Sequence, residues 1–263
     1  MLTPPDEGDA LVARLRAAGC VWAEGEAELL LGAADGPAEL ERLLRRRVGG
    51  EPIELVIGWV QFAGLRLQVG PGVFVPRRRT ELLARAALAR IRPDGVVVEM
   101  CCGVAPVAAV VAAAVDSAVG ELHVCDTSEA ALSWARVNVP AATVHRGDLY
   151  DALPGDLAGR VDVLVANAPY VPTEHLSSMP PEARDHEPRE ALDGGPAGVD
   201  VHRRLAGAAP AWLAPGGVLL VECGAGQVPL TSAAMRAVGL EVEVESDAEI
   251  GGWVVAGRSA QRS

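Results

Sequence analysis

The stretch with the most specific chemistry is Asn167-Ala168-Pro169-Tyr170, which directly follows the apolar segment 161–166. The carboxamide of Asn167 offers a carbonyl acceptor. Pro169 fixes its own φ and has no N–H, so backbone carbonyls around it stay free to accept. Tyr170 adds a flat wall. Such a corner can hold a planar amide or amine by both hydrogens and leave the nitrogen lone pair pointing outward, although an ordinary Asn-x-Pro turn is the alternative.

Two aspartates follow other strand-like segments. Asp126 ends the segment 121–125, where a carboxylate can accept both hydroxyl hydrogens of a ribose. Asp148 follows the segment 143–145 and is placed to accept a hydrogen bond from an adenine amino group. Both have a plainer interpretation, because 126–129 also forms a capping box for the next helix and Asp148 fits an ordinary turn.

A third candidate loop runs from Glu99 to Ala105, between an apolar strand candidate and an Ala/Val-rich helix. A tight turn of small residues lets a ligand approach the backbone and the N-terminus of the helix. Gly103 is the only glycine of a possible three in this turn, so an ordinary strand-to-helix connection is the alternative.

These loops need a parallel sheet that brings the carboxyl ends of its strands together. From Gly95 onward, apolar strand candidates alternate with helical segments; the strand candidates are 96–100, 121–125, 143–145, 161–166, 217–222, 240–245 and 253–256. Several are nearly continuous apolar runs, as expected when both faces of a parallel sheet are covered. The pattern predicts the α/β class, with a Rossmann-like, doubly wound, mostly parallel sheet of seven strands.

Two segments precede this sheet. Helical periodicity over 9–48 ends at Gly49-Gly50-Glu51-Pro52, which predicts a domain boundary. Period-two apolar patterning from Ile53 to Val75 predicts a β-hairpin that links the two domains. We therefore expect a small helical domain at 1–50, a hairpin linker at 51–80 and the main domain at 81–263.

The composition excludes several classes of function. All 23 basic residues are arginine, so the chain has no lysine for a pyridoxal phosphate Schiff base, a Walker-type phosphate loop or a kinase-type ATP site. A net charge of −12 opposes direct binding to nucleic acid, and the low aromatic content opposes base stacking.

The cysteine, histidine and hydropathy patterns indicate the cellular compartment of the protein and whether it binds a metal. The five cysteines show no C-x-x-C pair or disulfide framework, which favours a reducing compartment, and the five histidines show no metal-ligand spacing, so we expect no metal. The longest apolar run, 104–115, is too short to span a bilayer, and the first residues lack the features of a signal peptide. We expect a cytoplasmic protein without a membrane partner.

The motifs together resemble the HemK/PrmC-type protein-(glutamine-N5) methyltransferases, which belong to the Rossmann-like methyltransferases that use S-adenosylmethionine. The resemblance runs from about Gly49 to the C-terminus. It rests on motifs in the family's order: Gly50-Glu51-Pro52, Phe74-Val75-Pro76-Arg77 with Thr80-Glu81, Asp126, Gly147-Asp148, 167–170, 187–195, 198–200 with Arg203, and Glu222-Cys223-Gly224 with Gln227.

The resemblance implies that S-adenosylmethionine is bound by Glu99, Cys101, Gly103, Ala105, Asp126, Asp148, Leu149 and Asn167. It also implies that Asn167, Pro169 and Tyr170 orient a glutamine side-chain amide for in-line methyl transfer, which needs alignment and a dry site but no prior general base. Arg77, Ala168 and Glu187 are expected to contact the substrate. Arg77 also fits a solvated hairpin exit, and the segment around Glu187 fits either a lid or a long surface connection.

The implied acceptor is a glutamine of a protein, such as a translation factor, recognised through the helical segment 1–50. The chain departs from the family pattern in three places. The usual Gly-x-Gly-x-Gly is Cys101-Cys102-Gly103-Val104-Ala105, whose extra Cβ atoms narrow the methionine end of the site. Ala168 replaces the first proline of Asn-Pro-Pro-Tyr, and the N-terminal helical segment is short. These departures keep open a small-molecule amine or amide acceptor, and a non-catalytic binding protein.

Overall fold

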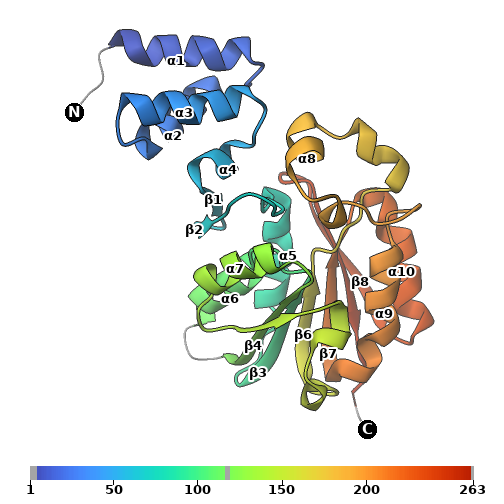
Figure 1. The fold of residues 1–263 in the computed structure, drawn as a ribbon. Coiled ribbons are helices and arrows are strands. Elements are labelled where there is room, and N and C mark those ends of the chain that lie inside the picture. The colour runs from blue at the N-terminus through green and yellow to red at the C-terminus, as the bar shows by residue number, and fades with distance from the viewer. Residues whose placement is uncertain (1–4, 116–118, 262–263) are drawn as a thin grey trace.

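The computed structural model describes residues 5–115 and 119–261. Its centre is a seven-stranded sheet of order β5-β4-β3-β6-β7-β9-β8, and the doubly wound α/β sheet expected from the sequence is confirmed (Figure 1). The strands are β3 (Gly95–Met100), β4 (Val119–Asp126), β5 (Thr143–Arg146), β6 (Val161–Ala166), β7 (Leu213–Glu222), β8 (Glu241–Asp247) and β9 (Gly252–Arg258). All neighbours are parallel except β9, which runs antiparallel to both β7 and β8.

Helices cover both faces of the sheet. One face packs against α5 (Glu81–Leu88), α6 (Pro106–Val115) and α7 (Glu129–Asn138), and the other against α9 (Asp200–Trp212) and α10 (Val228–Ala237). Alternate residues of β3 divide between the two cores: Val97 joins the α5–α7 side, whereas Val96 and Val98 join the α9–α10 side. All three are buried, which explains why the β3 sequence is apolar without alternation.

The strand register brings the predicted loops to one level. Strand β3 lies between β4 and β6, so the chain winds away from it in opposite directions. Met100 pairs with Cys125 on one side and with Ala166 on the other. The residues that come next along the three strands therefore leave the sheet side by side, at the switch point where ligands bind in folds of this kind.

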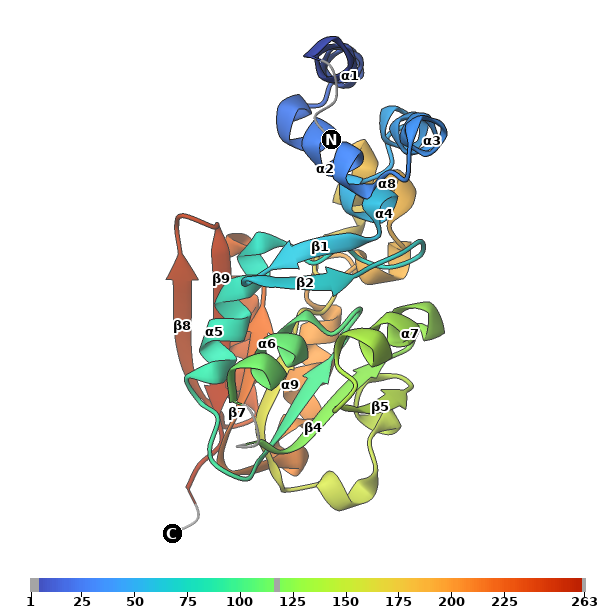
Figure 2. The ribbon, with the colours of Figure 1, turned by 90° about the vertical axis from the view of Figure 1, so that its left-hand side faces the viewer.

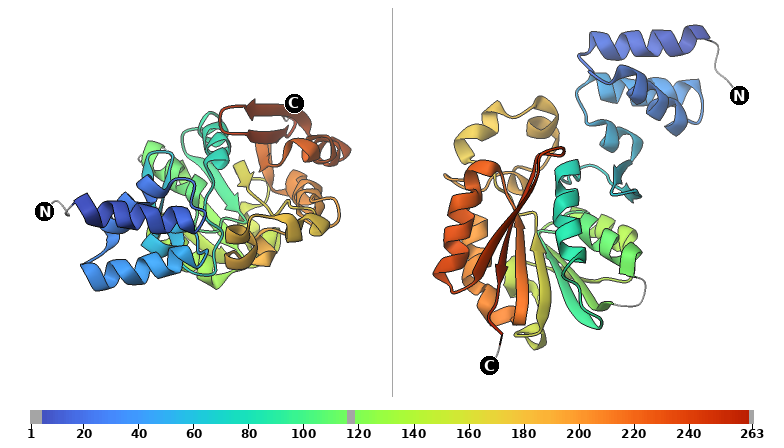
Figure 3. Two further views of the ribbon diagram at one scale, coloured as in Figure 1. Left: turned by 90° about the horizontal axis from the view of Figure 1, so that it is seen from above. Right: turned by 180° about the vertical axis from the view of Figure 1, so that it is seen from behind.

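Four short helices form a separate core at the N-terminus: α1 (Pro5–Ala17), α2 (Ala23–Ala33), α3 (Pro37–Val48) and α4 (Ile53–Ile57). They lie beyond the carboxyl ends of the strands, with the antiparallel hairpin of β1 (Trp59–Phe62) and β2 (Leu65–Gln68) between them and the sheet (Figure 2; Figure 3, right). Arg47 of α3 pairs with Glu26 of α2 and with Glu182 of α8 (Pro181–His186). This pair of contacts ties the N-terminal helices to the segment above the sheet.

The expectation of a hairpin from residue 53 is wrong for residues 53–57, which form the helix α4. The helix starts after Pro52 and ends at Gly58, whose φ of 83° gives a left-handed C-cap. Arg46 then donates to the carbonyls of Leu55 and Val56, which satisfies the free end of the helix. This long-range cap has no local signal, so the apolar alternation of the stretch was misleading. Among the described residues, no helix combines the length and apolarity needed to cross a membrane.

Candidate active site

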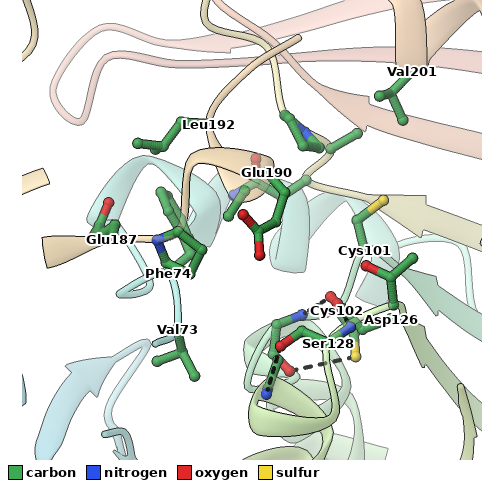
Figure 4. A pocket seen from close by; sticks show the side chains of 18 of the residues that line it. Val73, Phe74, Cys101, Cys102, Asp126, Ser128, Glu187, Glu190, Leu192 and Val201 are labelled. Carbon is green, nitrogen blue, oxygen red and sulfur yellow. Dashed lines mark hydrogen bonds between the residues drawn. The ribbon is translucent and has the colours of Figure 1, made fainter. Parts of the chain in front are cut away.

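A cavity opens over the carboxyl ends of β3, β4, β5 and β6, under the segment 187–192 (Figure 4). Twelve of the thirteen residues selected from the sequence line it: Arg77, Glu99, Cys101, Gly103, Asp126, Asp148, Leu149, Asn167, Ala168, Pro169, Tyr170 and Glu187. Ala105 does not; it is fully buried and packs in the core beneath α6. The structure therefore gathers the predicted residues in one place, with Ala105 supporting the wall from behind.

The turn after β3 has backbone angles typical of glycine at three positions, although only one of the three is a glycine. Cys101, Gly103 and Ala105 have φ values of 50°, 55° and 61°, in the left-handed region at each alternate position. The turn is held by hydrogen bonds from the Cys102 N–H to the Cys125 carbonyl (3.0 Å) and from the Ala105 N–H to the Cys102 carbonyl (2.7 Å). The two non-glycine residues at these angles store backbone strain of about 1–2 kcal/mol each. Burial raises the pKa of the Cys101 thiol, which keeps it protonated.

Glu99 fixes the start of the helix that follows this turn. Its carboxylate accepts hydrogen bonds from the N–H groups of Val107 (3.2 Å) and Ala108 (2.6 Å), in the first turn of α6. Burial raises the pKa of Glu99 to about 8, against the opposing effect of these two hydrogen bonds. These two hydrogen bonds hold the first turn of α6 against the end of β3, so Glu99 fixes the shape of the cavity wall that it also lines.

Asp126 ties the two neighbouring loops together. Its Oδ2 accepts from the Gly103 N–H (2.9 Å) and its Oδ1 from the Ser128 N–H (2.9 Å). Ser128, and not Asp126, caps α7, with its hydroxyl accepting from the Ala131 N–H at 3.3 Å. Burial raises the pKa of Asp126, and the backbone hydrogen bonds oppose that rise. Each carboxylate oxygen keeps a second lone pair for a ligand that enters the cavity.

The loop after β5 contributes a charged and an apolar residue. Asp148 forms an ion pair with Arg204 of α9 at 2.7 Å, and both side chains are about half exposed (54% and 53%). Leu149 has a φ of 50° and is buried in the cavity wall. Sequence reasoning missed Arg204, which also lines the cavity, because nothing in α9 distinguishes it from other exposed helical arginines.

The corner after β6 is held by residues distant in sequence. Asn167 donates through Nδ2 to the Thr80 hydroxyl at 3.2 Å, and Thr80 is completely buried. Because this hydrogen bond uses the amide nitrogen of Asn167, the carbonyl oxygen of the side chain remains available as an acceptor. Thr80 also faces the carboxylate of Glu222, at the end of β7.

Glu222 is the centre of this network. It accepts a hydrogen bond from the Tyr170 hydroxyl at 3.2 Å and one from Arg79 Nε at 3.3 Å. The Arg79 guanidinium also lies over the Tyr170 ring, 5.6 Å from its centroid. Burial raises the pKa of Glu222 and also that of Tyr170, so the tyrosine remains a hydrogen-bond donor.

Thr80, Arg79 and Glu222 were not among the predicted site residues. A signal for Glu222 was present, since it is a carboxylate at the end of a buried strand, as Glu99 and Asp126 are. Thr80 belongs to the motif Thr80-Glu81 of the resemblance and Arg79 to the basic run 77–79, but neither was assigned a role in the site, because that role depends on the hairpin exit lying against β6 and β7.

The last wall is the segment above the cavity. Glu187 accepts from Arg77 Nη2 at 2.5 Å and from the Val75 N–H at 3.2 Å, with its side chain fully buried. Arg77 in turn lies over the Phe74 ring, 5.2 Å from its centroid. These contacts anchor the segment 187–192 to the hairpin exit, so that the cavity has a cover on this side. In the described ranges, no three His, Cys, Asp or Glu side chains are grouped to hold a metal ion.

Comparison with known proteins gives several relatives that are named release factor glutamine methyltransferases. The chain is 40% identical over 205 residues to the release factor glutamine methyltransferase of Streptomyces coelicolor, covering 74% of this chain and 72% of that protein. It is 35% identical over 252 residues to the enzyme of the same name from Moorella thermoacetica, covering 87% and 88%. The chain belongs to the HemK/PrmC-type methyltransferase family. This confirms the resemblance inferred from the motifs, and it makes the chain a methyltransferase.

Another relative within the same range of identity has a different acceptor in its name. It is a 4-amino-L-phenylalanine/4-methylamino-L-phenylalanine methyltransferase of Streptomyces pristinaespiralis, and the chain is 36% identical to it over 234 residues, covering 86% of this chain and 78% of that protein. No protein-family model matches the chain.

Solved structures confirm the fold of this family member. A methyltransferase from Pyrococcus furiosus superposes with a TM-score of 0.54 at 17% identity, covering 75% of this chain and 90% of that one. The ribosomal protein L11 methylase of Lactobacillus delbrueckii gives 0.53 at 15%, covering 74% and 86%. The sheet and its helices thus have the fold of these two methyltransferases.

Proposed function

We propose that this methyltransferase transfers a methyl group from S-adenosylmethionine to the side-chain amide nitrogen of a glutamine in a protein acceptor, as the names of its release factor relatives suggest. One observation carries the proposal. The Asn167–Tyr170 corner opens into the same cavity as the left-handed turn and Asp126, so a donor and an acceptor can meet there.

The residues present fit the cofactor. The left-handed backbone at Cys101 and Gly103 forms a concave wall for the methionine end, and the lone pairs of Asp126 are placed for ribose hydroxyls. Leu149 offers an apolar face for the adenine, and Asp148 lies beside it as a hydrogen-bond acceptor. When bound, S-adenosylmethionine supplies a methyl group that is already activated by the sulfonium charge.

The residues of the chain then have to align the acceptor amide and exclude water from it. Asn167, fixed by Thr80, accepts one amide hydrogen through its carbonyl oxygen, and a backbone carbonyl beside Pro169 accepts the other. Tyr170, held by Glu222, packs against the amide plane. The nitrogen lone pair is then directed toward the cofactor side of the cavity, and the amide proton leaves as or after the methyl arrives, so no base is required beforehand.

We further propose that the N-terminal helices (1–50) and the hairpin linker (51–80) recognise the protein acceptor. They lie beyond the carboxyl ends of the strands, on the side where the cavity is covered by the 187–192 segment. We expect the acceptor to be a cytoplasmic protein and not a nucleic acid, since the net charge of −12 opposes a phosphate backbone.

The test is transfer of a labelled methyl group from S-adenosylmethionine to a bacterial translation release factor, followed by mapping of the label to a glutamine. Asn167→Ala should lower kcat/KM by about 100- to 1000-fold, since it removes the acceptor that orients the amide. The calorimetric Kd for S-adenosylmethionine should change by less than about threefold, because Asp126 and the turn remain. Unchanged turnover in Asn167→Ala rules out this assignment.

A small amine or amide is the second candidate acceptor. The relative named for 4-amino-L-phenylalanine supports it, and so does Ala168, which is smaller than proline and lies in the cavity wall. Incubation of the enzyme and labelled cofactor with release factor and 4-amino-L-phenylalanine in parallel separates the two. Label in the amino acid alone would replace the protein acceptor by the small one.

A further inference from the structure

The cover of the cavity carries a carboxylate whose role the proposed reaction leaves open. Glu190 lies in the short 3-10 turn Arg189–Ala191 and lines the cavity. Its side chain points into the open space between Phe74 on one side and Cys101 on the other, above Asp126 and Ser128 (Figure 4). Glu190 is exposed to solvent at the cavity mouth.

The segment that carries Glu190 is fixed at both ends. On one side Glu187 is anchored by Arg77 and the Val75 N–H. On the other, the Val171 N–H donates to the Leu192 carbonyl (2.9 Å), and the Thr173 hydroxyl donates to Asp193 (2.6 Å). The position of Glu190 over the cavity is therefore built into the fold.

The cavity is lined by some carboxylates that, among the described residues, have no arginine partner, whereas its arginines are all paired. Each arginine that lines it is already paired: Arg77 with Glu187, Arg79 with Glu222 and Arg204 with Asp148. Within the described part of the chain, Glu190 has no ion pair. Its carboxylate is close enough to Asp126 to contribute to the rise in the pKa of that residue. Two carboxylates thus approach one cavity from opposite walls, which favours a cation between them.

We propose that Glu190 recognises the positive sulfonium of S-adenosylmethionine and thereby favours the cofactor over its neutral product, S-adenosylhomocysteine. This rests on the proposed function. If Asp126 holds the ribose, the sulfur attached to that ribose would lie on the Asp126 side of the cavity, which Glu190 faces. Transfer of the methyl group moves the positive charge from sulfur to the acceptor nitrogen, from which it leaves with the proton. The attraction to Glu190 therefore ends with the reaction, which favours exchange of product for fresh cofactor.

The test compares two ligands that differ by one methyl group and one charge. Glu190→Gln keeps the size of the side chain and removes its charge. The Kd for S-adenosylmethionine should rise about two- to fivefold, as expected for a solvent-exposed charge pair, whereas the Kd for S-adenosylhomocysteine should stay within about 1.5-fold. Calorimetric titration of the full-length protein measures both, and a thermal melt confirms that the variant is folded.

Two controls make the result specific. Glu249→Gln removes the same charge from an exposed turn outside the cavity and should alter neither Kd. Raising the salt concentration should weaken S-adenosylmethionine binding in the wild type more than in Glu190→Gln. Equal weakening of both ligands, or no weakening of either, would overturn the role of Glu190 while leaving the proposed reaction intact. Absence of binding of either ligand to the wild type would instead overturn the proposed function and this inference with it.

Discussion

The two halves of the cavity are held together in different ways. In the half proposed for the cofactor, Glu99 and Asp126 accept from backbone N–H groups: Glu99 from Val107 and Ala108, 8 and 9 positions away, and Asp126 from Gly103, 23 positions away. Asp148 is the exception, because it pairs with the side chain of Arg204, 56 positions away. In the acceptor half, side chains bind side chains across long separations: 87 positions from Thr80 to Asn167, 52 from Tyr170 to Glu222 and 143 from Arg79 to Glu222.

From this difference we expect cofactor binding to depend on the shape of the local loops, and acceptor alignment to depend on the packing of the hairpin exit against the sheet. Variants in the two halves should therefore separate into those that change the Kd of the cofactor and those that change turnover at constant Kd.

The largest effect we expect is on the stability of the acceptor half at acidic pH. His202 is fully buried, bonds to the Thr231 hydroxyl (2.9 Å) and packs beside Tyr170. Burial lowers the pKa of His202 to about 4, from an ordinary value near 6.5. The unfolded chain then binds the proton more tightly than the folded one, so stability is full above about pH 6.5 and is lost as the pH falls toward 4, by about 3 kcal/mol.

The variant His202→Phe removes this titration. Urea unfolding across this pH range should give a free energy of unfolding that falls less steeply with acid than in the wild type, because a phenyl ring at this position takes up no proton. The exposed His175→Gln is the matched control and should follow the wild type. Burial raises the pKa of Glu99, so this residue makes the folded state more stable as the pH falls and opposes the effect of His202. The quantity to measure is therefore the difference in the free energy of unfolding between variant and wild type at each pH. Parallel curves for His202→Phe and wild type would contradict the prediction.

Next in size is the loss of Asp126. Asp126→Ala removes the predicted ribose acceptor and the tie to the Gly103 N–H, so the Kd for S-adenosylmethionine should rise about 30-fold. Asp156→Ala, in an exposed turn away from the cavity, should leave the Kd unchanged. Calorimetry that finds the same affinity in Asp126→Ala and wild type would remove Asp126 from the cofactor half.

A smaller effect should appear in the acceptor half alone. Thr80→Val keeps the shape of a buried side chain but loses the hydroxyl that fixes Asn167. We expect kcat/KM to fall about tenfold with the Kd for S-adenosylmethionine within about twofold, and Thr80→Ser to restore turnover. Equal losses in turnover and cofactor affinity would show that the two halves are not separable.

The smallest effect concerns the left-handed turn. Ala105 and Ala109 are both buried alanines, but Ala105 has a φ of 61° whereas Ala109 lies in the helix α6. Glycine relieves strain at the first position and weakens the helix at the second. Ala105→Gly should therefore be less destabilising than Ala109→Gly, by at least about 1 kcal/mol in urea unfolding. Equal losses would mean that the turn stores no strain.

That the candidate residues meet in one cavity could be predicted from the sequence, because the signals are local. Apolar strand runs end abruptly in a polar residue at Asp126 and Asn167, and the parallel register then brings both to one edge. The contacts that hold Asn167 and Tyr170 were missed, because Thr80 and Glu222 meet only after the hairpin exit packs on the sheet. The helix α4 was missed for a similar reason, since Arg46 caps it from another helix. The extra Cβ atoms at Cys101 and Ala105 were visible in the sequence, whereas the left-handed backbone angles of these two residues were not.

The hydrogen bond between Thr80 and Asn167 also determines where this chain can be recombined. A chimera that exchanges the N-terminal helices between relatives, cut just before the helix at residue 81, would separate Arg77, Arg79 and Thr80 from the side chains that they contact, which are Glu187, Glu222 and Asn167. The crossover has to precede Arg77, so that the short run 77–80 is inherited with the sheet.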